Sequence, residues 1–96
     1  MPTAFQTRIA TAAGDASYSG RCRILGFYVT AGVDAATVTI NDALTAAGGG
    51  TTLEVGAGIG LTEQMMIPGP GLVFQTGLSI ASTGTTPTVG VFYAVE

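Results

Sequence analysis

The chain has 96 residues, enough for one ordinary domain, and carries a net charge of −3 from six acidic residues and three arginines, with no histidine and no lysine. Recognition of phosphate requires clustered cations, so we expect no nucleic-acid partner. No apolar run approaches the roughly 18 residues of a membrane-spanning helix, and residues 1–11 lack the basic and apolar regions of a secretory signal, so we expect no membrane partner and no export.

The shortage of charged side chains bears on the surface of the folded protein. Hydrophobic residues make up 47% of the chain and charged residues 9%. A folded monomer of this size exposes about 5,000 Å². The nine charged side chains then give roughly one charge per 550 Å², well below the charge density that usually keeps a small free domain soluble. We infer that other subunits cover part of this surface; the alternative is a monomer with a threonine-rich surface.

Segments with the alternation of β-strands follow one another along the chain, whereas helix signals are nearly absent. Residues 5–12 alternate, and after a turn expected at residues 14–16 comes a stretch, 18–30, long enough for one bent strand or two, with Gly20 and Gly26 as candidate bulges. Further strands are expected at residues 37–41, 52–55, 61–67, 72–75, 78–81 and 88–95. The sequence thus predicts an all-β protein, a single-domain β-sandwich of jelly-roll-like type spanning residues 1–96, with about eight short antiparallel strands.

Two of the expected strands are apolar on both faces, residues 24–29 and 89–95. We expect these two strands to pair. One face suits the core and carries Leu25, Phe27, Val29, Val89, Val91 and Val95. The other face carries Ile24, Tyr28 and Phe92, which a free sandwich would expose to water, so we predict that it is a subunit interface. The alternative is a register change at Gly26 and Gly90 that turns the aromatic rings inward.

The residues that usually carry catalysis are scarce in this chain. Without histidine and lysine, only carboxylates remain as proton movers. Turns account for Asp15 and Asp34, whereas Asp42 and Glu63 have no evident structural reason. Asn41, Asp42 and Asp34 carry the oxygen ligands that calcium takes, but Asx turns explain such residues at strand ends more simply. We predict no catalytic, cofactor-binding or metal-binding residues, and no enzyme.

Two further features have structural interpretations. The glycine-rich segment 56–61, GAGIGL, does not fit the dinucleotide-binding spacing and has no helix after it, so we interpret it as a turn or bulge between strands. Cys22 is the only cysteine, which excludes an internal disulfide, suits a reducing cytosol and predicts a small buried apolar side chain.

The segment 67–78, IPGPGLVFQTGL, contains two prolines and three glycines. Pro68 and Pro70 each remove a backbone donor, so the chain must leave the sheet ladder here. We predict a stiff crossing between two strands, with Pro68 and Pro70 available to contact a neighbouring subunit.

Four segments together resemble a known class of protein: residues 23–32, 36–42, 67–78 and 89–93. Their order is similar to that of the small all-β virion proteins of tailed bacteriophages, the capsid decoration or cement class and related head-fibre and tail adaptors. Residues 42–43 are Asp-Ala where such proteins often have Asp-Gly. The resemblance implies a β-sandwich or jelly-roll subunit, commonly trimeric, that binds the major capsid protein on the virion surface after assembly in the host cytoplasm.

Some alternatives stay open at this stage. Residues 1–11 form either an arm that reaches a neighbour or an ordinary first strand. A tail, neck or head-fibre adaptor is a second function of the same class. A carbohydrate-binding β-sandwich is a rival, although tryptophan, the usual platform for a sugar ring, is absent and only Tyr18, Tyr28 and Tyr93 could replace it.

Overall fold

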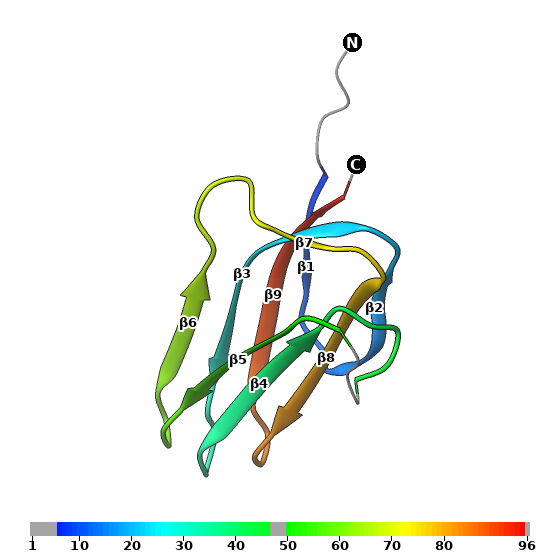
Figure 1. Cartoon of the computed structure of the whole chain (residues 1–96). Coiled ribbons are helices and arrows are strands. Elements are labelled where there is room, and N and C mark those ends of the chain that lie inside the picture. The colour runs from blue at the N-terminus through cyan, green and yellow to red at the C-terminus, as the bar shows by residue number, and fades with distance from the viewer. Residues whose placement is uncertain (1–5, 47–49, 96) are drawn as a thin grey trace.

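The computed structural model describes residues 6–46 and 50–95, and this part of the chain forms nine β-strands and no helix (Figure 1). Four strands make one sheet, here the second sheet, in the order β2 (Gly14–Ser19), β8 (Gly77–Thr83), β4 (Ala36–Asn41) and β5 (Thr52–Ala57). The first sheet has the order β1 (Gln6–Ala10), β9 (Thr88–Val95), β3 (Cys22–Thr30) and β6 (Thr62–Met66), with β7 (Leu72–Phe74) also paired to β3. The predicted all-β sandwich is therefore confirmed.

The strands pair as one long hairpin that is folded across both sheets. Working inward from the chain ends, β1 pairs with β9, β2 with β8, β3 with β6 and β7, and β4 with β5, all antiparallel. The fold is closed by two further ladders, β3 with β9 and β4 with β8. The pairing predicted for the two strands that are apolar on both faces is thus confirmed as β3 with β9.

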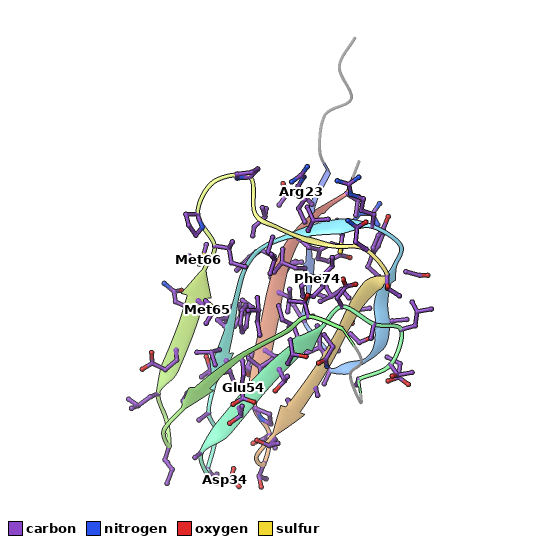
Figure 2. All side chains as sticks on the ribbon, viewed as in Figure 1. Arg23, Asp34, Glu54, Met65, Met66 and Phe74 are labelled. Atoms are coloured by element: carbon purple, nitrogen blue, oxygen red, sulfur yellow. The ribbon has the colours of Figure 1, made fainter. Side chains whose placement is uncertain are left out.

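The core lies between the two sheets and is built from alternate residues of their strands. In β4, Val38 and Ile40 are fully buried, while the intervening threonines are half-exposed. This is the period-2 pattern of a strand with one wet face. The largest fully buried apolar side chains are Ile24, Phe27, Val29, Val38, Ile40, Phe74, Leu78, Ile80 and Val91. Phe74 lies in the interior in Figure 2.

A bulge in β3 decides which of its residues face the core. Opposite β9, Ile24 faces Tyr93 while Gly26 faces Phe92, so β3 has one extra residue between them. The extra residue corrects two predictions. Ile24 is 0% exposed and belongs to the core, so it is not on the outer face. Leu25, expected in the core, is only partly buried. The alternative, a register change at Gly26 and Gly90 that turns the aromatic rings inward, is wrong about the rings. The register of β3 and β9 shifts only between Ile24 and Gly26, and the shift places Ile24 in the core while Tyr28 and Phe92 stay half-buried.

The proline-rich segment also differs from its prediction. Gly26 faces Met66 on β6 and Ile24 faces Leu72 on β7, so residues 67–71 leave and rejoin the same edge of β3. The amide of Ile67 still donates to the carbonyl of Leu25 at 3.0 Å. The chain does leave the ladder here, as predicted, but as a loop on one edge and not as a crossing between strands (Figure 1).

Three local predictions have clear outcomes. Residues 14–16 are not a turn between strands: they open β2, whose register is irregular between Gly14 and Tyr18 and whose Ala16 has a φ of 45°. The glycine-rich segment is a turn between β5 and β6, because Leu61 N donates to Gly58 O at 3.0 Å and Gly60 has a φ of 71°. Residues 6–10 form an ordinary edge strand, and the rest of the proposed arm, residues 1–5, lies outside the described residues.

Candidate functional site: an apolar stripe on the outer face of the first sheet

The outer face of the first sheet carries a row of apolar side chains that runs across its strands. In the ladders, Ile9 on β1 is paired with Phe92 on β9. Phe92 is also paired with Gly26 on β3, and Gly26 is paired with Met66 on β6. Ile9 is 48% exposed and Met66 60%. Tyr28 joins the row from β3, with its ring centroid 6.0 Å from that of Phe92 and the planes tilted by 40°. We call Ile9, Tyr28, Met66 and Phe92 the apolar stripe.

Two glycines shape this stripe. A Cβ added to Gly26 would lie 2.7 Å from the sulfur of Met66, so the methionine side chain covers the place where a side chain would stand. A Cβ added to Gly90 would collide with the ring of Tyr28, which lies over that glycine. The side chains of Met66 and Tyr28 therefore lie over the two glycines, along the sheet.

The predicted interface residues are separated by the fold. Tyr28 and Phe92 meet on the outer face, half-buried, as predicted. Pro68 and Pro70 are exposed, and they belong to the loop that joins β6 to β7 (Figure 1). Ile24 is absent from this face because of the bulge described above. Neither Ile9 nor Met66 was among the predicted interface residues, because only the cross-strand register aligns them with Phe92.

The three aspartates of the described residues each hold a loop in place. Asp42 accepts from the amides of Gln75, Thr76 and Gly77 at 2.9, 2.7 and 3.2 Å. The amide of Thr85 donates to Asp34 at 2.6 Å, and the amide of Ala46 donates to Asp15 at 2.6 Å. Such bonds are the structural role of aspartates in turns.

The electrostatics of Asp42 agree with this role. Partial burial by itself would raise the pKa of the Asp42 carboxyl, but the hydrogen bonds from Gln75, Thr76 and Gly77 lower it below the ordinary value of 3.8. Asp42 is therefore ionised at neutral pH and works as an acceptor for backbone N–H groups. A raised pKa, which a general acid needs, is not found here.

Asp42 and Glu63 are not brought together as a catalytic pair. Asp42 follows the end of β4 and binds residues 75–77, whereas Glu63 lies exposed on β6 opposite Val29. Asp34 and Asp42 stand at opposite ends of β4, so they cannot share a calcium ion. Within residues 6–46 and 50–95, no cluster of three or more acidic or cysteine residues has the arrangement of a metal site.

Cys22 is buried, as predicted, with 2% of its surface exposed. Burial, and secondarily the charge of Asp42, raises the pKa of its thiol to about 11. The thiolate is the nucleophilic form of cysteine, so this residue is inert at neutral pH.

The three tyrosines are not gathered on one surface of the protein. Tyr93 is 6% exposed and packs against Tyr18 in the core, with ring centroids 5.6 Å apart. The guanidinium carbon of Arg8 lies 5.7 Å from the centre of the Tyr18 ring and covers it. Only Tyr28 faces outward on a sheet, and it is tilted against Phe92.

Comparison of the chain with protein-family models, with curated proteins and with solved structures finds no match. No helix in the described part of the chain is long and apolar enough to cross a membrane. The site must therefore be interpreted from its own geometry, and its main feature is the apolar stripe.

Proposed function

We propose that this protein is a structural subunit, a jelly-roll sandwich that assembles with copies of itself through the apolar stripe and acts as a decoration or cement subunit on the capsid of a tailed bacteriophage. The observation that carries the proposal is the stripe of Ile9, Tyr28, Met66 and Phe92 across the outer face of the first sheet. A homotrimer is the expected assembly, and the major capsid protein is the expected partner.

The strand pairing supports the jelly-roll assignment. A jelly roll has eight strands in two sheets, built from two Greek keys. If β6 and β7 are taken as one interrupted strand opposite β3, eight strands remain, and they pair as a long hairpin folded across two sheets. The two closing ladders, β3 with β9 and β4 with β8, are the ones that such a fold adds to the hairpin.

The size of the stripe sets how much further surface a self-assembly contact requires. Four strands spaced about 4.8 Å apart, over five residues of about 3.3 Å each, make a face of roughly 300 Å². A standard interface buries about 800 Å² per partner. The interface must therefore extend beyond the stripe, and the loop of residues 67–71 with Pro68 and Pro70 is the adjoining exposed surface.

A role on a capsid is supported by the structural roles of the aspartates and the cysteine, and by the resemblance of the sequence. The aspartates and the cysteine are all accounted for by structural roles, and binding to a lattice requires no chemistry. Symmetric repetition of modest contacts gives strong overall attachment. The resemblance of the sequence to phage decoration proteins points in the same direction.

The mass of the purified protein in solution tests self-assembly. Light scattering at micromolar concentration should give about 28 kDa, three times the 9.5 kDa of the chain. Met66→Asp should lower the mass toward that of the monomer while leaving the fold intact, because Met66 is 60% exposed. The matched control is Val33→Asp, which is 74% exposed in the β3–β4 loop and should remain assembled. A monomeric wild-type protein, or an assembled Met66→Asp variant, would contradict the proposal.

The capsid setting needs a separate experiment. Labelled protein should co-sediment with tailed-phage capsids, and electron microscopy should locate it on the outer lattice of the head. Density on the tail or neck would instead favour the adaptor function, and a specific signal on a glycan array would favour a carbohydrate-binding module.

A further inference from the structure

Three apolar side chains are exposed together at one end of the sandwich, and neither the core nor the apolar stripe accounts for them. Val33 belongs to the loop between β3 and β4, and Ile59 and Leu61 belong to the turn between β5 and β6. These side chains are 74%, 68% and 58% exposed. We call Val33, Ile59 and Leu61 the apolar tip.

Hydrogen bonds hold the loops of the tip together. The amide of Ala31 donates to the carbonyl of Leu61 at 2.9 Å, which joins the β3–β4 loop to the β5–β6 turn. The amide and the hydroxyl of Thr85 donate to Asp34 at 2.6 and 3.1 Å, which joins the same loop to the β8–β9 loop. A Cβ added to Gly32 would lie 2.8 Å from the carbonyl oxygen of Thr85, so these two loops pack backbone against backbone. Figure 1 shows the three connections at the lower end of the molecule.

The apolar tip lies apart from the apolar stripe. Leu61 precedes Met66 by five residues, which corresponds to roughly 16 Å along β6. The stripe lies on the outer face of the first sheet, whereas the tip lies at the ends of the strands, so subunits that pack through the stripe leave their tips uncovered. All subunits of a cyclic trimer have the same orientation relative to its axis, so the three tips face the same way.

The charged side chains at this end are acidic. Asp34 lies within the loops of the tip, and Glu63 is exposed two residues beyond Leu61. The arginines lie on β1 and around the start of β3, toward the opposite end, and Figure 2 shows Arg23 at the upper end and Asp34 at the lower end. A complementary partner is therefore apolar at its centre and basic at its rim, whereas a second tip or an anionic membrane would meet like charge.

The size of the tip also bears on its partner. Three aliphatic side chains, each about two-thirds exposed, offer on the order of 200 Å² of apolar surface. This is about a quarter of the roughly 800 Å² that each partner buries in a stable interface. A single tip therefore binds weakly, and firm attachment requires a partner that repeats its sites with the symmetry of the assembled subunits, so that several tips bind at once.

We propose that the apolar tip is the surface by which the subunit attaches to the capsid. Val33, Ile59 and Leu61 enter an apolar hollow of the coat protein whose rim carries lysine or arginine side chains. This inference rests on the proposed function and adds the capsid-binding surface to it. The stripe joins the copies to one another, and the tips join the assembly to the lattice.

Substitutions in the tip test the proposal, with empty capsids of the same phage as the probe. Val33→Asp and Ile59→Asp should each keep the wild-type mass in light scattering and the wild-type circular dichroism. Each should weaken co-sedimentation with the capsids at least about tenfold, because every tip of the assembly is altered. The matched control is Leu44→Asp, which changes an exposed apolar side chain near Gly77, outside the tip, and should bind normally.

The basic rim has a test of its own. Glu63→Gln should weaken capsid binding and make it less sensitive to salt, because it removes one of the acidic side chains beside the tip. Glu54→Gln, an exposed change on β5, should alter neither property. Equal behaviour of these two variants overturns the basic rim.

The outcomes separate this inference from the proposed function. Normal capsid binding by Val33→Asp and Ile59→Asp overturns the role of the tip and leaves the capsid role of the subunit intact. Loss of assembly in these variants would place the tip between copies of the chain. Tip-dependent binding to phosphatidylcholine vesicles, without binding to capsids, would make a lipid surface its partner, and either result overturns the proposal. A wild-type protein that assembles but does not bind the capsids overturns both the tip and the capsid role.

Discussion

Asp42 is the residue whose removal should most clearly weaken the fold without touching the core. Its carboxylate accepts from three successive amides, those of Gln75, Thr76 and Gly77, and so fixes the turn by which the chain passes from β7 to β8. Removing a capping carboxylate costs about 0.5–2 kcal/mol, and hydrogen bonds to a charged group are worth about 1.5–3 kcal/mol each when buried. Two of these three bonds are exposed, so water replaces part of the loss.

We therefore expect Asp42→Ala to lower the free energy of unfolding by about 2 kcal/mol, and Asp42→Asn by about half as much, because a neutral amide oxygen still accepts. A domain of this size loses about 4–8 °C in Tm for each 1 kcal/mol, so Asp42→Ala should melt about 8–16 °C below wild type. The measurement is thermal and urea denaturation followed by circular dichroism. The control is Glu54→Gln, an exposed change that should stay within about 0.5 kcal/mol.

The same bonds predict a dependence on pH. The folded pKa of Asp42 lies below its ordinary value of 3.8, so its contribution is complete above that value and is lost as the pH falls through the folded pKa. The difference in stability between wild type and Asp42→Asn should be constant from about pH 7 to pH 5 and should shrink below about pH 4. An Asp42→Ala variant no less stable than Glu54→Gln, or a difference that grows in acid, would refute the capping role.

Three further predictions follow from burial and close contacts. Ile24→Asp should unfold the protein at every concentration instead of dissociating it, because Ile24 is fully buried. Ile24→Ala should lower the free energy of unfolding by about 2–5 kcal/mol in urea denaturation. A folded, monomeric Ile24→Asp variant would show instead that Ile24 belongs to the subunit interface. Gly90→Ala should cost about 1–3 kcal/mol because its methyl group displaces the Tyr28 ring, and most of that cost should vanish when Tyr28→Ala is also present; a cost that persists would locate the strain elsewhere. Cys22 should resist a thiol reagent at about pH 8 in the native protein and react fully in denaturant, whereas rapid native labelling would show an open core.

Local sequence patterns were sufficient to predict most strands. Val38 and Ile40 alternate with threonines, and a period of two places alternate side chains on one face whatever the partner strand. The pairing of β3 with β9 was also predictable, because a strand apolar on both faces needs a neighbour and two layers around it. The burial of the single cysteine followed from composition, since nothing in the chain could activate it.

The candidate site was only partly predictable, for a reason visible in its members. Tyr28 and Phe92 were identified from strand alternation, and the structure brings them together. Ile9 and Met66 come from strands far away in sequence, and only the ladder registers place them in the same row as Phe92. Asp42 was one of two carboxylates without an evident structural reason, because the amides that it accepts from lie more than thirty residues further along the chain.

The sequence by itself determined the fold class, the positions of most strands, most of the alternating core and the lack of histidine and lysine side chains. Only the tertiary structure decided which face Ile24 occupies and where residues 67–71 go. A single extra residue in β3 between Ile24 and Gly26 reverses the orientation of the side chains that precede it, and no local pattern encodes where a partner strand tolerates such a bulge. The segment with Pro68 and Pro70 must leave the sheet because proline has no backbone N–H to donate. Its return to the same edge of β3 depends on the pairing of Leu72 with Ile24.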